Sequence, residues 1–99
     1  MEKSISARGS TRGGSPEQVF GRVLRSVRES QALSQEELGF RSGYHRTYIG
    51  QLERGEKSAS LRTIVNLATT LSVRPSLLIR RMERDLSKVV PKTPQTIKP

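Results

Sequence analysis

The sequence predicts an all-α domain of five helices, and three observations support this fold class. Apolar residues recur at spacings of three and four through the middle of the chain, most of these segments open with a helix-capping pattern or a proline, and no useful stretch alternates apolar and polar residues as a strand does. A chain of 99 residues has room for one hydrophobic core rather than two. We expect the helical domain over residues 15–84, a flexible basic arm over residues 1–14, and a flexible tail with three prolines over residues 85–99.

The first expected helix begins at Pro16. Ser15 and Gln18 form a capping box around it, in which the serine hydroxyl accepts a hydrogen bond from a backbone N–H of the first turn, and proline suits the first helical position. The apolar stripe that follows extends the helix to about Gln31 and consists of Phe20, Val23, Leu24 and Val27.

Two short helices follow. Residues 34–37, Ser-Gln-Glu-Glu, form a second capping box that begins a helix with Leu38 facing inward. Gly43 ends this helix where a left-handed residue is needed, and a third helix is expected over residues 45–54, ending at Gly55. Two short helices joined by a tight glycine turn are the geometry of a helix-turn-helix.

The last two helices are expected to complete the core. Ser60 caps a fourth helix, and Pro75 begins a fifth at a first-turn position. The buried stripe of the fourth helix is predicted to consist of Leu61, Ile64, Leu67, Ala68 and Leu71. The apolar residues of the fifth helix are Leu77, Leu78, Ile79 and Met82.

The net charge of +9 favours an anionic partner, with nucleic acid ahead of an acidic membrane surface. The excess is not confined to the ends of the chain, because residues 16–84 carry 12 Lys and Arg against 7 Asp and Glu. Arginine outnumbers lysine in this segment, and its planar guanidinium can bind a phosphate or a guanine through two hydrogen bonds.

The composition argues against several other classes of protein. The absence of cysteine excludes disulfides, thiolate metal sites and cysteine nucleophiles, and His45 is the only histidine, so we expect no metal site, cofactor or catalytic residue. No apolar run is long enough to span a membrane, and residues 1–15 lack the apolar core of a secretory signal. We therefore expect a non-enzymatic, cytoplasmic protein.

The third expected helix divides into two faces. At 100° per residue, the polar face holds donors and short side chains and no carboxylate. Such side chains can enter a major groove and read base edges. The residues of this polar face are Arg46, Thr47, Gly50, Gln51 and Arg54. The residues that anchor the opposite face are Tyr48, Ile49 and Leu52.

The ordered set of motifs resembles the Cro/repressor-type helix-turn-helix family, also called the Xre family. The motifs that carry the resemblance are Leu33-Ser34-Gln35-Glu36-Glu37-Leu38, Ser42-Gly43, Arg46-Thr47-Tyr48-Ile49, Leu52-Glu53-Arg54-Gly55, Ser60-Leu61, Ile64 and Leu67-Ala68. The resemblance covers residues 18–83 and implies a compact, five-helix, lambda-repressor-like DNA-binding domain with the helix-turn-helix at its second and third helices. The string over residues 46–49 is also similar to that of restriction-modification controller proteins.

The resemblance implies a role for each matching residue. Base reading falls to Arg46, Thr47 and Gln51, of which Arg46 suits guanine and Gln51 suits adenine. Contacts with the DNA backbone are implied for Ser34, Gln35, Tyr48, Arg54, Lys57 and Ser58. The alternative for Tyr48 is a place in the core. Arg28 and Glu53 match a buried ion pair that fixes the angle of the reading helix.

Three residues depart from the family pattern. Gly39 stands where alanine is usual, at a cost of about 1 kcal/mol in helix propensity. His45 stands where Ser, Thr or Asp commonly caps the third helix. We therefore expect the N-terminal cap of this helix to be weaker, or to be provided by another group. Gly50 stands where a small polar residue is frequent, which argues against a base contact there.

The expected function is regulation of transcription by a homodimer bound to double-stranded DNA at a pseudo-palindromic operator. Regulation would block RNA polymerase or recruit it by surface contact, at the bacterial or phage nucleoid. The residues expected at the dimer interface are Val73, Leu77, Ile79, Arg81 and Met82. The alternative is an antitoxin-type module that binds a toxin and its own promoter. Arg8 and Arg12 of the arm either enter a minor groove or add only nonspecific attraction.

Overall fold

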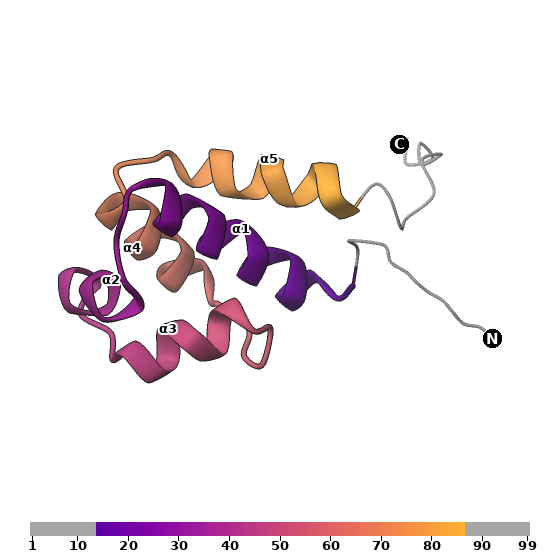
Figure 1. The fold of residues 1–99 in the computed structure, drawn as a ribbon. Helices are drawn as coiled ribbons and strands as arrows, with labels where there is room; N and C mark the ends of the chain where they lie inside the picture. Colours follow the sequence, from indigo (N-terminus) through magenta and orange to yellow (C-terminus); the bar gives the residue numbers. More distant parts are fainter. Residues whose placement is uncertain (1–13, 87–99) are drawn as a thin grey trace, which may run out of the picture.

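The computed structural model describes residues 14–86, which form five α-helices and no strand (Figure 1). The helices are α1 (Pro16–Ser30), α2 (Gln35–Ser42), α3 (Arg46–Glu53), α4 (Leu61–Thr70) and α5 (Pro75–Leu86). The predicted all-α fold, with its helix order, is therefore confirmed. The last helix continues two residues past the expected end of the domain at residue 84. The expected arm, with Arg8 and Arg12, and the tail beyond residue 86 lie outside the described residues.

The helices pack around α1. Figure 1 shows α1 between α5 on one side and α3 on the other, with α2 beside α3 and α4 behind them. None of the helices within residues 14–86 is long and apolar enough to cross a membrane. The buried apolar side chains of the core are Val19, Phe20, Val23, Leu24, Val27, Leu33, Leu38, Ile49, Leu52, Leu67, Ala68, Leu71 and Leu78. All five helices contribute to this core, so the helix-turn-helix cannot be separated from the rest of the domain.

Side-chain caps begin the helices where the sequence predicts them. Ser15 Oγ accepts from the backbone N–H of Gln18 at 3.0 Å, and the Gln18 side chain accepts from the N–H of Ser15 at 3.0 Å. The same reciprocal pair joins Ser34 and Glu37 at the start of α2. At α3 the cap is His45 itself, whose Nδ1 accepts from the N–H of Thr47 at 3.0 Å. An imidazole nitrogen thus replaces the hydroxyl or carboxylate that usually caps this helix.

The predicted buried stripe of α4 is wrong at its first residue. Leu61 is 82% exposed, whereas Thr63 in the same turn is buried. The buried side of the helix follows a spacing of four, through Thr63, Leu67 and Leu71. A stripe defined by apolar residues alone could not include Thr63, because threonine is buried here through its hydrogen bonds.

A cluster of hydroxyl groups joins α4 to the back of α3. Thr63 Oγ1 lies 3.1 Å from Ser60 Oγ, 3.3 Å from the Tyr44 hydroxyl and 3.4 Å from the Tyr48 hydroxyl. The rings of Tyr44 and Tyr48 pack at a centroid distance of 5.2 Å. Tyr48 is half-buried against the core, so its ring supports α3 from behind.

Two glycines allow backbone to approach backbone. A Cβ atom on Gly21 of α1 would lie 2.4 Å from the carbonyl oxygens of Leu52 and Glu53, at the end of α3. A Cβ atom on Gly39 of α2 would lie 2.5 Å from the carbonyl oxygen of Tyr44. Glycine at position 39 therefore does more than lower helix propensity, since it lets the turn close against α2.

Gly21→Ala is expected to lower the free energy of unfolding by about 1–2 kcal/mol, because overpacking against backbone outweighs the gain in helix propensity. Urea unfolding followed by circular dichroism measures this loss. The control is Ser26→Ala, an exposed change on the same helix, which we expect to stay within about 0.5 kcal/mol of the parent. Equal stability of the two variants would contradict the close approach of α1 to α3.

Candidate nucleic-acid interface

The outer face of α3 is polar and accessible. Arg46 and Thr47 are exposed and Gln51 is half-buried, while Ile49 and Leu52 are fully buried on the opposite face. These positions agree with the two faces expected from 100° per residue. In Figure 1, α3 runs along the edge of the molecule farthest from α5.

The turn before α3 fixes its direction. Gly43 ends α2 in the left-handed conformation, with φ of +85°, and the N–H of Tyr44 donates to the carbonyl oxygen of Gly39 at 2.8 Å. A Cβ atom on Gly43 would meet nothing within 4 Å, so glycine is favoured there by its backbone angles and not by space.

A buried ion pair holds α3 against α1. Arg28 donates from Nε and Nη2 to the two carboxylate oxygens of Glu53, at 2.7 and 2.9 Å, and from Nη1 to the carbonyl oxygen of Leu33 at 2.8 Å. Both side chains are more than 90% buried. The hydrogen bonds to Glu53 raise the pKa of Arg28 above its ordinary value. The pair expected at these two positions is thus present, and each of the three guanidinium nitrogens of Arg28 donates a hydrogen bond.

Gln35 is joined to the same carboxylate. Its Nε2 donates to Glu53 Oε1 at 2.9 Å, so the first residue of α2 is oriented by the ion pair between α1 and α3. The adjoining hydroxyl of Ser34 accepts from the N–H of Glu37 as the cap. Two carboxylates, Glu36 and Glu37, lie in the first turn of α2 and reduce the attraction of this helix end for phosphate.

Arg54, at the end of α3, is folded back along the helix. Its Nε and Nη2 donate to the Glu56 carboxylate at 2.8 and 3.2 Å. Its Nη1 lies 3.1 Å from the place that a Cβ atom on Gly50 would occupy. Gly50 is buried although it falls on the polar side of the helix, since the side chains of Arg54 and Gln35 lie over it. This position therefore offers no direct contact to a base.

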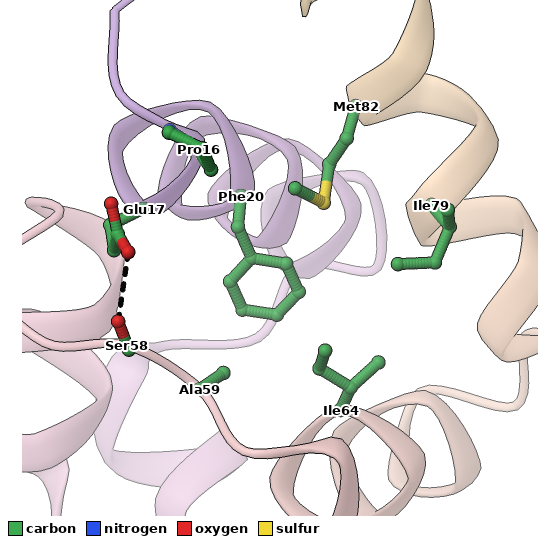
Figure 2. Close-up of a pocket in the computed structure, with 8 residues that line it drawn as sticks. All are labelled: Pro16, Glu17, Phe20, Ser58, Ala59, Ile64, Ile79 and Met82. Atoms are coloured by element: carbon green, nitrogen blue, oxygen red, sulfur yellow. Dashed lines mark hydrogen bonds between the residues drawn. The ribbon is translucent and has the colours of Figure 1, made fainter. Parts of the chain in front are cut away.

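The loop after α3 meets the first turn of α1. Figure 2 shows the Ser58 hydroxyl pointing to Glu17, and the hydrogen bond that it donates to Oε2 measures 2.9 Å. This bond lies at the rim of an apolar pocket of about 120 Å³ whose lining includes Phe20, Ile64, Ile79 and Met82. The neighbouring Lys57 is exposed. Of these two loop residues, Ser58 is therefore bonded within the fold, whereas Lys57 is exposed.

Carboxylates flank the polar face of α3, and they were not anticipated from the sequence. Arg46 Nη1 lies 3.9 Å from Glu36 Oε1, Arg54 is bound to Glu56, and Ser58 to Glu17. The third helix carries no outward carboxylate, as expected, but its neighbours in space do. Gly21 was also missed, although a lone glycine within a helical pattern is a signal of close packing.

The comparisons with known proteins agree with this geometry. Residues 24–78 match the helix-turn-helix family. The chain is 43% identical over 65 residues to control protein C.SmaI of Serratia marcescens. The matched segment covers 65% of this chain and 77% of that protein. It is 40% identical over 62 residues to control protein C.BamHI of Bacillus amyloliquefaciens, with coverage of 62% and 76%.

Solved structures show the same fold. The restriction-modification controller protein C.AhdI of Aeromonas hydrophila is 46% identical, with a TM-score of 0.61, and covers 62% of this chain and 92% of its own. The controller protein C.Esp1396I, a tetramer in complex with its natural 35 base-pair operator, matches with a TM-score of 0.67 over 74% of this chain and 96% of its own. Its identity is 19%, so that likeness concerns the fold.

Arg28→Ala is expected to lower the free energy of unfolding by about 3–5 kcal/mol, because the Glu53 carboxylate would stay buried without its cation. Urea unfolding measures the loss. The control is Arg25→Ala, which breaks an exposed pair with Glu29 and should cost less than about 1 kcal/mol. A loss for Arg28→Ala no larger than for the control would contradict the role of the buried pair.

Proposed function

The chain belongs to the helix-turn-helix family, and from that premise we propose that it binds double-stranded DNA sequence-specifically and regulates transcription as a homodimer. The observation that carries the proposal is the exposed polar face of α3, braced from behind by buried Ile49 and Leu52 and by the Arg28–Glu53 pair. An eight-residue helix held this firmly can enter a major groove without losing its shape.

Base reading is assigned to three residues of this face. Arg46 offers a two-pronged donor that suits guanine, and Gln51 offers the donor and acceptor that suit adenine. Thr47 is exposed beside them and can contact a base edge or a thymine methyl group. These contacts supply sequence preference, whereas contacts to phosphate supply position and affinity.

Backbone contacts are assigned chiefly to Gln35, Arg54 and Lys57. Gln35 has one amide hydrogen on Glu53 and a second with which to meet a phosphate. Lys57 extends from the loop after α3. Ser58 and Tyr48 are weaker assignments, because their hydroxyls already bond to Glu17 and Thr63. The Ser34 hydroxyl accepts from the N–H of Glu37 and keeps its own proton for a phosphate.

The homodimer is proposed to form through α4 and the adjoining edge of α5. At 100° per residue, Leu77 and Ile79 lie on different edges of α5, so we favour the edge that adjoins α4 among the five residues expected from the sequence. Of these, Val73 and Met82 pack against the core, and Ile79 is 46% exposed. On the neighbouring helix, Leu61 and Val65 are 82% and 48% exposed.

A second copy of the chain suits this surface. Ile64 lines the same pocket as Ile79 (Figure 2), and Leu61 lies next to both Ile64 and Val65 at helical spacings of three and four. The apolar side chains of α4 and α5 therefore form one surface, whose burial would remove them from water. Two-fold pairing would present two α3 helices to half-sites about one turn of DNA apart.

Contact with RNA polymerase is proposed for the outer face of α2. Phe40 is 87% exposed there, beside Glu37 and Arg41. Because α2 adjoins α3, this exposed ring would lie near DNA bound by α3, within reach of a polymerase on the adjoining DNA. The chain is proposed to act without catalysis, in the bacterial cytoplasm, as befits likeness to bacterial control proteins. No feature of residues 14–86 favours the toxin-binding alternative.

The test of base reading begins by selecting bound sites from random DNA. For the selected operator we expect a dissociation constant of about 10⁻⁸ M or tighter. Arg46→Ala should weaken operator binding by about 1–3 kcal/mol and leave binding to a random duplex almost unchanged. Lys57→Ala is the matched control: it should weaken binding to both duplexes alike and reduce the salt slope by about 0.9. An unaltered preference in Arg46→Ala would refute the assignment.

The test of the dimer surface introduces a charge. Val65→Glu is expected to convert the dimer to a monomer in light scattering, since a carboxylate cannot be buried there without a partner. Ser26→Glu adds the same charge to an exposed site on α1 and should leave the dimer intact. If Val65→Glu remained a dimer, this surface would not be the interface.

A further inference from the structure

The pair formed by Arg54 and Glu56 is built into the turn after α3. Gly55 adopts a φ of +76°, and the N–H of Glu56 donates to the carbonyl oxygen of Gln51 at 2.9 Å. A Cβ atom on Gly55 would lie 2.6 Å from the Gln18 side chain, so the turn is fixed against α1. The Glu56 backbone is therefore held beside the end of the reading helix, where its carboxylate can reach Arg54.

The pair neutralises a cation on the face proposed to meet DNA. Two of the three guanidinium nitrogens of Arg54 donate to Glu56, and the third faces Gly50. The hydrogen bonds from Arg54 lower the pKa of Glu56 below its ordinary value, which is the direction expected for a carboxylate paired with a cation. A phosphate that approaches Arg54 therefore meets a guanidinium whose charge is already balanced.

The fold gains little from this arrangement. The two side chains are 58% and 52% exposed, and exposed ion pairs contribute little to stability because water and salt screen them. The buried Arg28–Glu53 pair, by contrast, joins two helices. An exposed pair that adds little to the fold, on the face that meets an anion, has its main effect on binding.

We propose that Glu56 competes with DNA phosphate for Arg54 and so limits the affinity of this protein for any duplex. The inference rests on the proposed function, in which Arg54 contacts the DNA backbone. Sequence-independent attraction to phosphate is the main source of nonspecific binding. When Glu56 holds Arg54, the protein gains less free energy from phosphate contacts. Base contacts then supply a larger share of the free energy of binding.

The experiment compares the full chain with Glu56→Gln, on the selected operator and on a random duplex, over a series of salt concentrations. Glu56→Gln should tighten binding to both duplexes by about three-fold and steepen the dependence of log K on log salt by about 0.9, because one more phosphate is neutralised. Urea unfolding should be unchanged, since the pair is exposed.

Two further comparisons separate competition from a general effect of charge. Glu83→Gln removes one exposed carboxylate from α5, which lies across α1 from the reading helix, and should leave binding unchanged (Figure 1). In an Arg54→Ala background, Glu56→Gln should have no effect, because the side chain for which Glu56 competes is gone.

The outcomes are distinct. If the parent protein bound no duplex, the proposed function would fall and the inference with it. If the parent bound DNA but Glu56→Gln matched it, or if the gain persisted in Arg54→Ala, the inference alone would be overturned. A gain that requires Arg54 supports it.

Discussion

The Arg28–Glu53 ion pair is the contact on which the arrangement of the reading helix depends. It joins α1 to α3, it satisfies the carbonyl oxygen of Leu33 before α2, and it receives the amide of Gln35 from α2. Four segments thus meet at one carboxylate and one guanidinium. Because the cost of removing two charges from water offsets much of their attraction, we interpret the pair as fixing an orientation more than adding stability.

Close packing, together with the ion pair, holds α3 in position. An isolated helix of eight residues is not stable in water, so α3 owes its form to its neighbours. Gly21 brings α1 against its last carbonyl oxygens, and buried Ile49 and Leu52 anchor it to the core. The polar face is therefore presented by a rigid support, and its side chains alone are left to adapt to DNA.

The sequence predicted the local features well, whereas the family resemblance supplied the one long-range contact that was expected, the Arg28–Glu53 pair. The capping boxes at Ser15 and Ser34 involve residues three apart, so the sequence alone is enough to predict them. The burial of Thr63, by contrast, involves hydrogen bonds with tyrosines fifteen and nineteen residues away, and Leu61 in the same turn is exposed. Likewise, a helical wheel of α3 shows no carboxylate on its outward face, and it cannot show Glu36 and Glu17, which approach the surroundings of α3 from other helices.

The two sides of α4 have different roles, and the hydroxyl cluster around Thr63 lies on the inner side. Its inner side holds Tyr48 of the reading helix, while its outer side carries Leu61 and Val65, where we place the second copy. One helix, ten residues long, would thus connect the element proposed to enter the groove to the proposed two-fold axis. In such a dimer the separation of the two α3 helices would be set within the rigid domain, and a change of operator spacing would require remodelling of α4 or of the adjoining edge of α5.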